Sequence, residues 1–208
     1  LLNIEGNDTR EFTDALGNLN LALEQVLSLP VGTYLAFHQH IFHAQTVLKV
    51  HTTELDAFAG VDAHQSCQTS IENFIVQAEH IERASSLTVL NLMLQPIAKE
   101  QLAAQLENLI KNPPHFLILQ GFGTGNIATN SELLNLFEAL YERGCVVIIS
   151  SQVVFGKLDQ RYAVSSWIEN AKVLINDCHS HADLYAKALQ MYLKYPTHVQ
   201  WFEHWNTH

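Results

Sequence analysis

A glycine-rich segment that ends in an asparagine is the part of this sequence best suited to bind a small molecule. It reads GFGTGN over residues 121–126 and lies between the apolar runs FLIL and CVVII. The side-chain amide of Asn126 can both donate and accept hydrogen bonds. Loops that follow parallel strands are where open α/β sheets bind their ligands. We therefore predict that Asn126 belongs to a substrate-binding site.

The spacing of the three glycines does not match a nucleotide-binding loop. Gly121, Gly123 and Gly125 follow the pattern GxGxG rather than GxGxxG, and no GK[ST] sequence occurs. The strand that begins at Cys145 ends in serines instead of the acidic residue that holds a ribose. Two interpretations stay open: the glycines permit a tight turn with positive φ, or they bring the backbone close to a small ligand. The nearby Asn126 favours the second interpretation.

Lys49 is the second candidate for chemistry, because it follows an apolar stretch and has few basic neighbours in the sequence. A partly desolvated lysine can lose its proton near neutral pH and help to activate a nucleophile. The alternative is a lysine whose stem packs on the protein while its amine reaches water.

Histidines and serines also invite a functional interpretation, but their spacing does not support one. On a single strand over 34–42, His38 and His40 would share one face, a spacing that can chelate a transition metal. No carboxylate or cysteine completes the set, so neither a metal site nor a cofactor is predicted. Ser150 and Ser151 lack the GxSxG turn of a serine hydrolase.

The elements that must position these residues alternate between strands and helices. Continuous apolar runs are typical of strands covered on both faces, as in a parallel sheet. The segment between the two runs predicts a helix with a Thr129–Glu132 capping box and a C-terminal cap at Gly144. The predicted fold class is therefore α/β, a parallel-sheet three-layer αβα sandwich preceded by part of a second α/β domain.

Changes in sequence character divide the chain into three parts. Residues 1–60 contain an apolar-periodic helix and one strand, residues 61–86 are predicted as a linker, and residues 87–208 form the αβα domain. The aromatic tail WFEHW is predicted as a packing or subunit-contact patch.

Composition limits the partners. The formal net charge is -10 with only 11 Lys and Arg residues, which argues against nucleic acid or an anionic membrane. No apolar run approaches the ~18 residues of a membrane span. Cysteines at 67, 145 and 178 form no metal-finger spacing and are predicted as reduced, mostly buried thiols, which fits a cytoplasmic protein.

Several segments together resemble the bacterial-type asparaginases, especially their cytoplasmic type I branch. They are TDALGNLNLAL near the start, HTTELDAFAG after Lys49, LILQGFGTGN, and VVIISSQ followed by GKLDQRYA. The resemblance keeps one register from about Thr13 to Leu193, interrupted by small gaps. It implies that residues 1–60 are the later part of an N-terminal asparaginase-like α/β domain and that residues 87–208 are the C-terminal domain.

The resemblance also implies an activity. Such enzymes hydrolyse L-asparagine to L-aspartate and ammonia through an acyl-enzyme on threonine, without a cofactor, as homodimers or homotetramers. Lys49 matches their catalytic lysine, and Asn126 matches an asparagine that contacts the substrate in a neighbouring subunit. The two threonine motifs of the family, Gly-Gly-Thr and His-Gly-Thr-Asp-Thr, would precede Leu1 and do not occur in this chain.

The chain departs from the family pattern at other positions too. It has HAQTVL before Lys49 where the family usually has an arginine-containing run. Gln120 replaces an arginine often found before the glycine loop in the type I branch, and Val153 replaces a nearby cysteine of that branch's effector pocket. Two hypotheses follow: part of an asparaginase-like amidohydrolase, inactive as this chain alone, or a non-catalytic asparaginase-like protein for small amino-acid binding or assembly.

Overall fold

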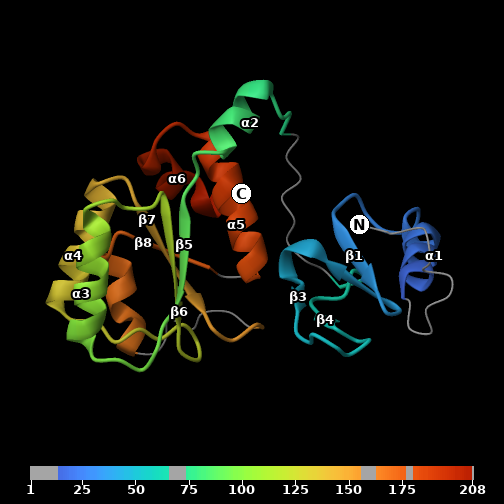
Figure 1. The fold of residues 1–208 in the computed structure, drawn as a ribbon, viewed down its shortest axis with the longest axis horizontal. Helices are drawn as coiled ribbons and strands as arrows, with labels where there is room; N and C mark the ends of the chain where they lie inside the picture. Colours follow the sequence, from blue (N-terminus) through green and yellow to red (C-terminus); the bar gives the residue numbers. More distant parts are fainter. Residues whose placement is uncertain (1–13, 66–73, 156–162, 177–179, 208) are drawn as a thin grey trace. The chain divides into compact units, whose positions relative to one another are not determined.

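The computed structural model describes residues 14–65, 74–155, 163–176 and 180–207 (Figure 1). The chain divides into two compact units, unit 1 (Leu1–Glu72) and unit 2 (Asn73–His208). The linker over 61–86 stays a prediction, and one helix, α2 (Ala78–Ala84), lies within its range and belongs to unit 2.

Unit 1 combines one helix with short antiparallel strand pairs. The elements are α1 (Ala15–Gln25), β1 (Tyr34–Phe37) paired with β2 (His40–His43), a 3-10 turn (Ala44–Thr46), and β3 (Leu48–Lys49) paired with β4 (Phe58–Ala59). The apolar side chains of α1 are not part of a buried core, because none of the residues of this helix is buried.

The single strand predicted over 34–42 is wrong, because the chain reverses in its middle. His38 and Gln39 have φ values of 43° and 68°, which makes them the two-residue turn of a hairpin. The backbone N–H of His38 donates to Oδ1 of Asn18 on α1 at 2.9 Å. His38 and His40 therefore do not share the face of one strand.

Unit 2 contains a four-stranded parallel sheet in the order β5-β6-β7-β8. The strands are β5 (Val89–Met93), β6 (Phe116–Gly121), β7 (Val146–Ser151) and β8 (Val173–Ile175). The two apolar runs of the sequence form the central strands, and all six residues of β6 are buried. The predicted α/β class and parallel sheet are confirmed.

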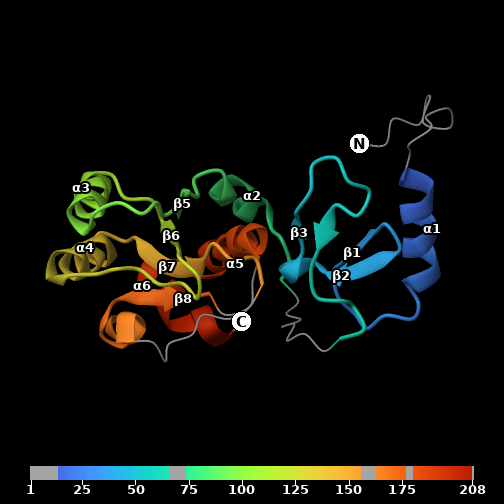
Figure 2. The same cartoon turned by 90° about the horizontal axis from the view of Figure 1, so that it is seen from below.

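Helices cover both faces of this sheet (Figure 2). One face is covered by α3 (Lys99–Ile110), α4 (Ser131–Glu142) and a 3-10 segment (Ala163–Asn170). The other face is covered by α5 (His181–Lys194), α6 (His198–His204) and a final 3-10 turn (Trp205–Thr207). Because side chains alternate along a strand, Leu117 and Leu119 pack with α3 and α4, whereas Phe116 and Ile118 pack with α5 and α6.

The aromatic tail is a packing element of unit 2. Trp201 and Trp205 are 4% and 1% exposed, and the ring of Trp201 lies 5.0 Å from that of Phe116. The indole N–H of Trp201 donates to the carbonyl of Tyr195 at 2.8 Å. Of the two roles predicted for WFEHW, the structure therefore confirms packing.

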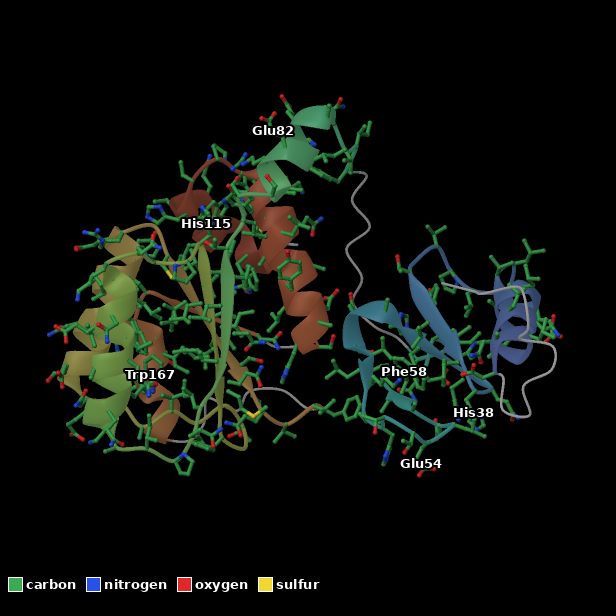
Figure 3. All side chains as sticks on the ribbon, in the orientation of Figure 1. His38, Glu54, Phe58, Glu82, His115 and Trp167 are labelled. Atoms are coloured by element: carbon green, nitrogen blue, oxygen red, sulfur yellow. The ribbon has the colours of Figure 1, made fainter. Side chains whose placement is uncertain are left out.

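A cluster of rings and one guanidinium fastens α2 to the amino end of the sheet. Arg83 lies 4.7 Å from the ring centroid of Tyr192 and donates to the carbonyl of Tyr195 at 2.8 Å. His115, which precedes β6 (Figure 3), accepts at Nδ1 from the amide of Thr88 at 3.0 Å. Burial, followed by the charge of Arg83, lowers the pKa of His115 below its ordinary value. The contact thus favours the neutral imidazole.

The start of α4 differs by one residue from the prediction. Asn130, not Thr129, is the N-cap, and its side chain accepts the amide of Leu133 at 2.9 Å. The predicted Thr129–Glu132 capping box is therefore wrong. Gly144 has φ of 90°, and its amide donates to the carbonyl of Tyr141, so the predicted glycine cap at the helix end is confirmed.

This difference gives a direct test. We expect Asn130→Ala to lower the free energy of unfolding by about 1 kcal/mol, because the first turn of α4 loses its cap. Thr129→Ala is expected to change it by less than about 0.5 kcal/mol. Urea unfolding followed by tryptophan emission measures both values in unit 2, where all three tryptophans lie. A larger loss for the Thr129 variant would contradict the assignment.

Candidate functional site

The glycine-rich loop forms a tight turn directly after β6. The amide of Phe122 donates to the carbonyl of Asn126 at 2.9 Å, and the amide of Asn126 returns a bond to the carbonyl of Phe122 at 2.7 Å. Gly125 N–H also donates to that carbonyl at 3.0 Å. The backbone of the turn is therefore closed on itself, with Asn126 at its far end.

The glycines of the loop are explained by this turn. A Cβ on Gly121 would lie 2.7 Å from the carbonyl carbon and oxygen of Gly125 and 2.8 Å from the oxygen of Asn126. Gly123 and Gly125 have φ values of 51° and 87°, which L side chains rarely adopt. Of the two interpretations left open by the sequence, the tight turn is sufficient to explain the glycines: packing requires one at position 121, and the positive φ favours one at positions 123 and 125.

Asn126 lies half-buried at the carboxyl edge of the parallel sheet. Its Nδ2 is 3.4 Å from Oγ1 of Thr124. A side-chain amide at this edge can donate to a carbonyl oxygen or accept from an amide or ammonium group. The role of Asn126 as a substrate contact stays a prediction.

Polar side chains at the ends of the central strands join the same edge. Gln120, only 5% exposed, donates through Nε2 to Oδ1 of Asn91 at 2.7 Å. Nε2 of Gln152 donates to the carbonyls of Leu94 at 2.6 Å and Gln120 at 3.1 Å. Within the part of the chain that the structure describes, Oε1 of Gln120 is buried without a hydrogen-bond partner.

These glutamines were not predicted as parts of the site. The signal that could have found them is a polar residue at the end of each continuous apolar run, Gln120 after FLIL and Gln152 after CVVII and two serines. Buried polar groups need partners, so a glutamine in such a place predicts a bond to a neighbouring strand.

Lys49 lies in unit 1, on β3, and its side chain is exposed. It stands opposite Phe58 in the antiparallel pair, and its Nζ is 5.8 Å from the centroid of that ring (Figure 3 labels Phe58). Asn126 lies in unit 2. Because its side chain is exposed, Lys49 is not desolvated by burial within unit 1. Its catalytic role stays a prediction.

The other sequence candidates have structural roles or lie outside the described residues. His43 is buried, and its Nε2 is bonded to the carbonyl of Gln65 at 3.0 Å. Cys145 is a buried free thiol whose pKa is raised by burial to about 12, so it is unreactive at neutral pH. Cys67 and Cys178 are not among the described residues. Among those that are, no three His, Cys, Asp or Glu side chains gather to hold a metal ion.

Comparison of the sequence with known proteins finds similarity to asparaginases. A family model described as "Asparaginase, N-terminal" matches residues 8–82. The L-asparaginase 1 proteins of Escherichia coli K12 and O157:H7 are each 26% identical to this chain over 176 residues. The chain is related to the bacterial-type asparaginases. The alignment covers 76% of this asparaginase-like chain, which spans about half the length of these curated relatives.

Solved structures of asparaginases share the fold. L-asparaginase I of Vibrio cholerae superposes with a TM-score of 0.68 at 20% identity, covering 92% of this chain and 60% of that protein. The thermostable L-asparaginase of Thermococcus kodakarensis gives a TM-score of 0.63 at 22% identity, covering 89% of this chain and 57% of that protein. These structures confirm the fold, and the sequence match to L-asparaginase 1 confirms the resemblance to the type I branch.

The packing of the loop against Gly121 gives a second prediction. We expect Gly121→Ala to lower the free energy of unfolding of unit 2 by about 1–3 kcal/mol, because the new methyl group collides with backbone atoms. The amide resonance of Asn126 should shift, since the turn must open. Gly123→Asn is the matched control: no atom lies within 4 Å of the added Cβ, and asparagine tolerates a positive φ. Equal effects of both changes would contradict this packing.

Proposed function

We propose that this chain contributes part of the active site of an asparaginase-like amidohydrolase that converts L-asparagine to L-aspartate and ammonia. The observation that carries the proposal is the sequence relation to proteins named L-asparaginase 1. The closed turn after β6 supports it, because that turn holds Asn126 at the edge of the sheet where α/β proteins bind ligands.

The chemistry assigns different tasks to the two candidate residues. A threonine hydroxyl from outside these 208 residues attacks the side-chain carbonyl carbon of asparagine, the C–N bond breaks, and ammonia leaves with the hydroxyl proton. Water then hydrolyses the ester to aspartate. Lys49 takes part in the proton transfer, and Asn126 binds the substrate through its amide.

The resemblance to the family also leads us to include a homodimer or homotetramer in the proposal, in which Asn126 serves the site of a neighbouring subunit. A cytoplasmic setting is also part of the proposal. No helix of the described residues is long and apolar enough to cross a membrane.

A second candidate function is supported by the threonine that precedes Lys49. Thr46 is buried, its hydroxyl donates to the carbonyl of His43 at 2.9 Å, and its oxygen accepts the amide of Val61 at 2.9 Å. Because this hydroxyl already makes two structural hydrogen bonds, it is poorly placed to act as the nucleophile. The observation favours a non-catalytic protein that binds a small amino acid or serves assembly.

The two candidates agree on the behaviour of the isolated chain. We expect the purified 208-residue chain to release no ammonia from L-asparagine above the uncatalysed rate, because a lysine can activate a threonine but cannot replace it. A coupled ammonia assay with millimolar L-asparagine measures this. Measurable turnover by the wild-type chain would contradict this expectation. If that turnover persisted in a Lys49→Ala variant, the chain would contain a different nucleophile. If the change abolished the turnover, the whole reaction would take place within this chain.

A further inference from the structure

The last residue of β7 holds the glycine loop through its side chain. The hydroxyl of Ser151 donates to the carbonyl oxygen of Gly123, at the tip of the loop. The same hydroxyl oxygen accepts the amide of Val153 at 2.9 Å, so both capacities of the group are used. The carbonyl of Ser151 accepts a bond from Nε2 of His181, in the first turn of α5, at 2.7 Å.

Gln152, the next residue, is hydrogen-bonded to the base of the loop. The amide of Gln152 donates to the carbonyl of Gly121 at 3.0 Å, and its side chain reaches the carbonyls of Leu94 and Gln120. The end of β7 therefore holds the loop at two points, Gly121 at its base and Gly123 at its tip.

These two points determine the position of Asn126. Phe122 lies between them, and its carbonyl receives the amides of both Gly125 and Asn126. Fixing the residues on either side of Phe122 fixes the direction of that carbonyl and thus the place of the residues bonded to it. Glycines offer no side chains to pack, so the bond from Ser151 replaces the packing that would otherwise hold a loop tip.

We propose that Ser151 is a positioning residue that sets the place of Asn126, with His181 holding the backbone of Ser151. The proposal rests on the function proposed above only for what Asn126 contacts. The claim that the Ser151 hydroxyl orders the loop rests on the hydrogen bonds described above. It can be tested without any substrate.

A hydroxyl is required because the group must donate to Gly123 and accept from Val153 at once. Threonine keeps both capacities on a slightly larger side chain, whereas alanine has neither. Ser131, exposed in the first turn of α4, is a matched control for a serine-to-alanine change in the segment that follows the loop.

The test is amide hydrogen exchange and ¹⁵N relaxation on the 208-residue chain. In Ser151→Ala, the amides of Gly125 and Asn126 should exchange about fivefold faster, as expected when ordinary hydrogen bonds are lost, and the side-chain amide of Asn126 should become more mobile. The amide of Val146, bonded to His115 at the opposite end of β7, should change by less than about twofold. Ser151→Thr should restore the loop values, and Ser131→Ala should leave them unchanged.

Unchanged exchange at Gly125 and Asn126 in Ser151→Ala would overturn the proposal, and so would equal acceleration at Val146, which indicates general destabilisation. If Ser151→Ala does not fold, the wild-type spectrum decides: a slowly exchanging Ser151 hydroxyl proton with a nuclear Overhauser effect to Gly123 is expected, and its absence would overturn the proposal. A failure of Asn126 to act on substrate would leave these loop measurements unaltered, so the two proposals fail separately.

Discussion

The parallel pairing of β6 with β7 is the constraint on which the rest of unit 2 depends. The two strands carry the continuous apolar runs, and residues on both of their faces are removed from water by helices on either side. A slip of one residue would turn every side chain to the opposite face. Burial thus fixes the register in which Gln120 lies beside Ser150 and Gly121 beside Ser151.

That register determines what happens where the strands end. Ser151 and Gln152 leave the sheet beside the glycine loop, within reach of its carbonyl groups. Gly121 can stand at the base of the loop because it lacks a side chain, which lets Gly125 and Asn126 fold back against it. The placement of Asn126 is therefore a consequence of sheet register, glycine conformation and a few bonds between side chain and backbone.

The sequence predicts those parts of the fold that depend on long apolar patterns. The parallel sheet and the glycine end of α4 follow from the apolar runs and residue type. The hairpin at His38 and Gln39 was missed because neither residue is a glycine, the usual signal of a positive φ. The cap of α4 was misplaced because Thr129 and Asn130 are both good N-caps, and only the backbone conformation distinguishes them.

The candidate site was predictable to a smaller extent. Asn126 stands out as a polar residue in a glycine loop, but the bonds of Ser151, Gln152 and His181 join segments far apart in sequence, and they exist only once the strands are in register. Lys49 was singled out for an apolar neighbourhood, whereas the short pair of β3 and β4 leaves its side chain exposed.

The central claim is that the glycine loop brings Asn126 into contact with the amide substrate. The most direct test is kcat/KM for L-asparagine in a longer protein that joins this chain to both threonine motifs, with Asn126→Ala compared with Asn135→Ala, a change at an exposed asparagine of α4. A fall of about tenfold to a hundredfold is predicted for the Asn126 variant alone, the effect of one lost hydrogen bond to a reacting group. Equal kcat/KM values for the two variants would contradict the claim.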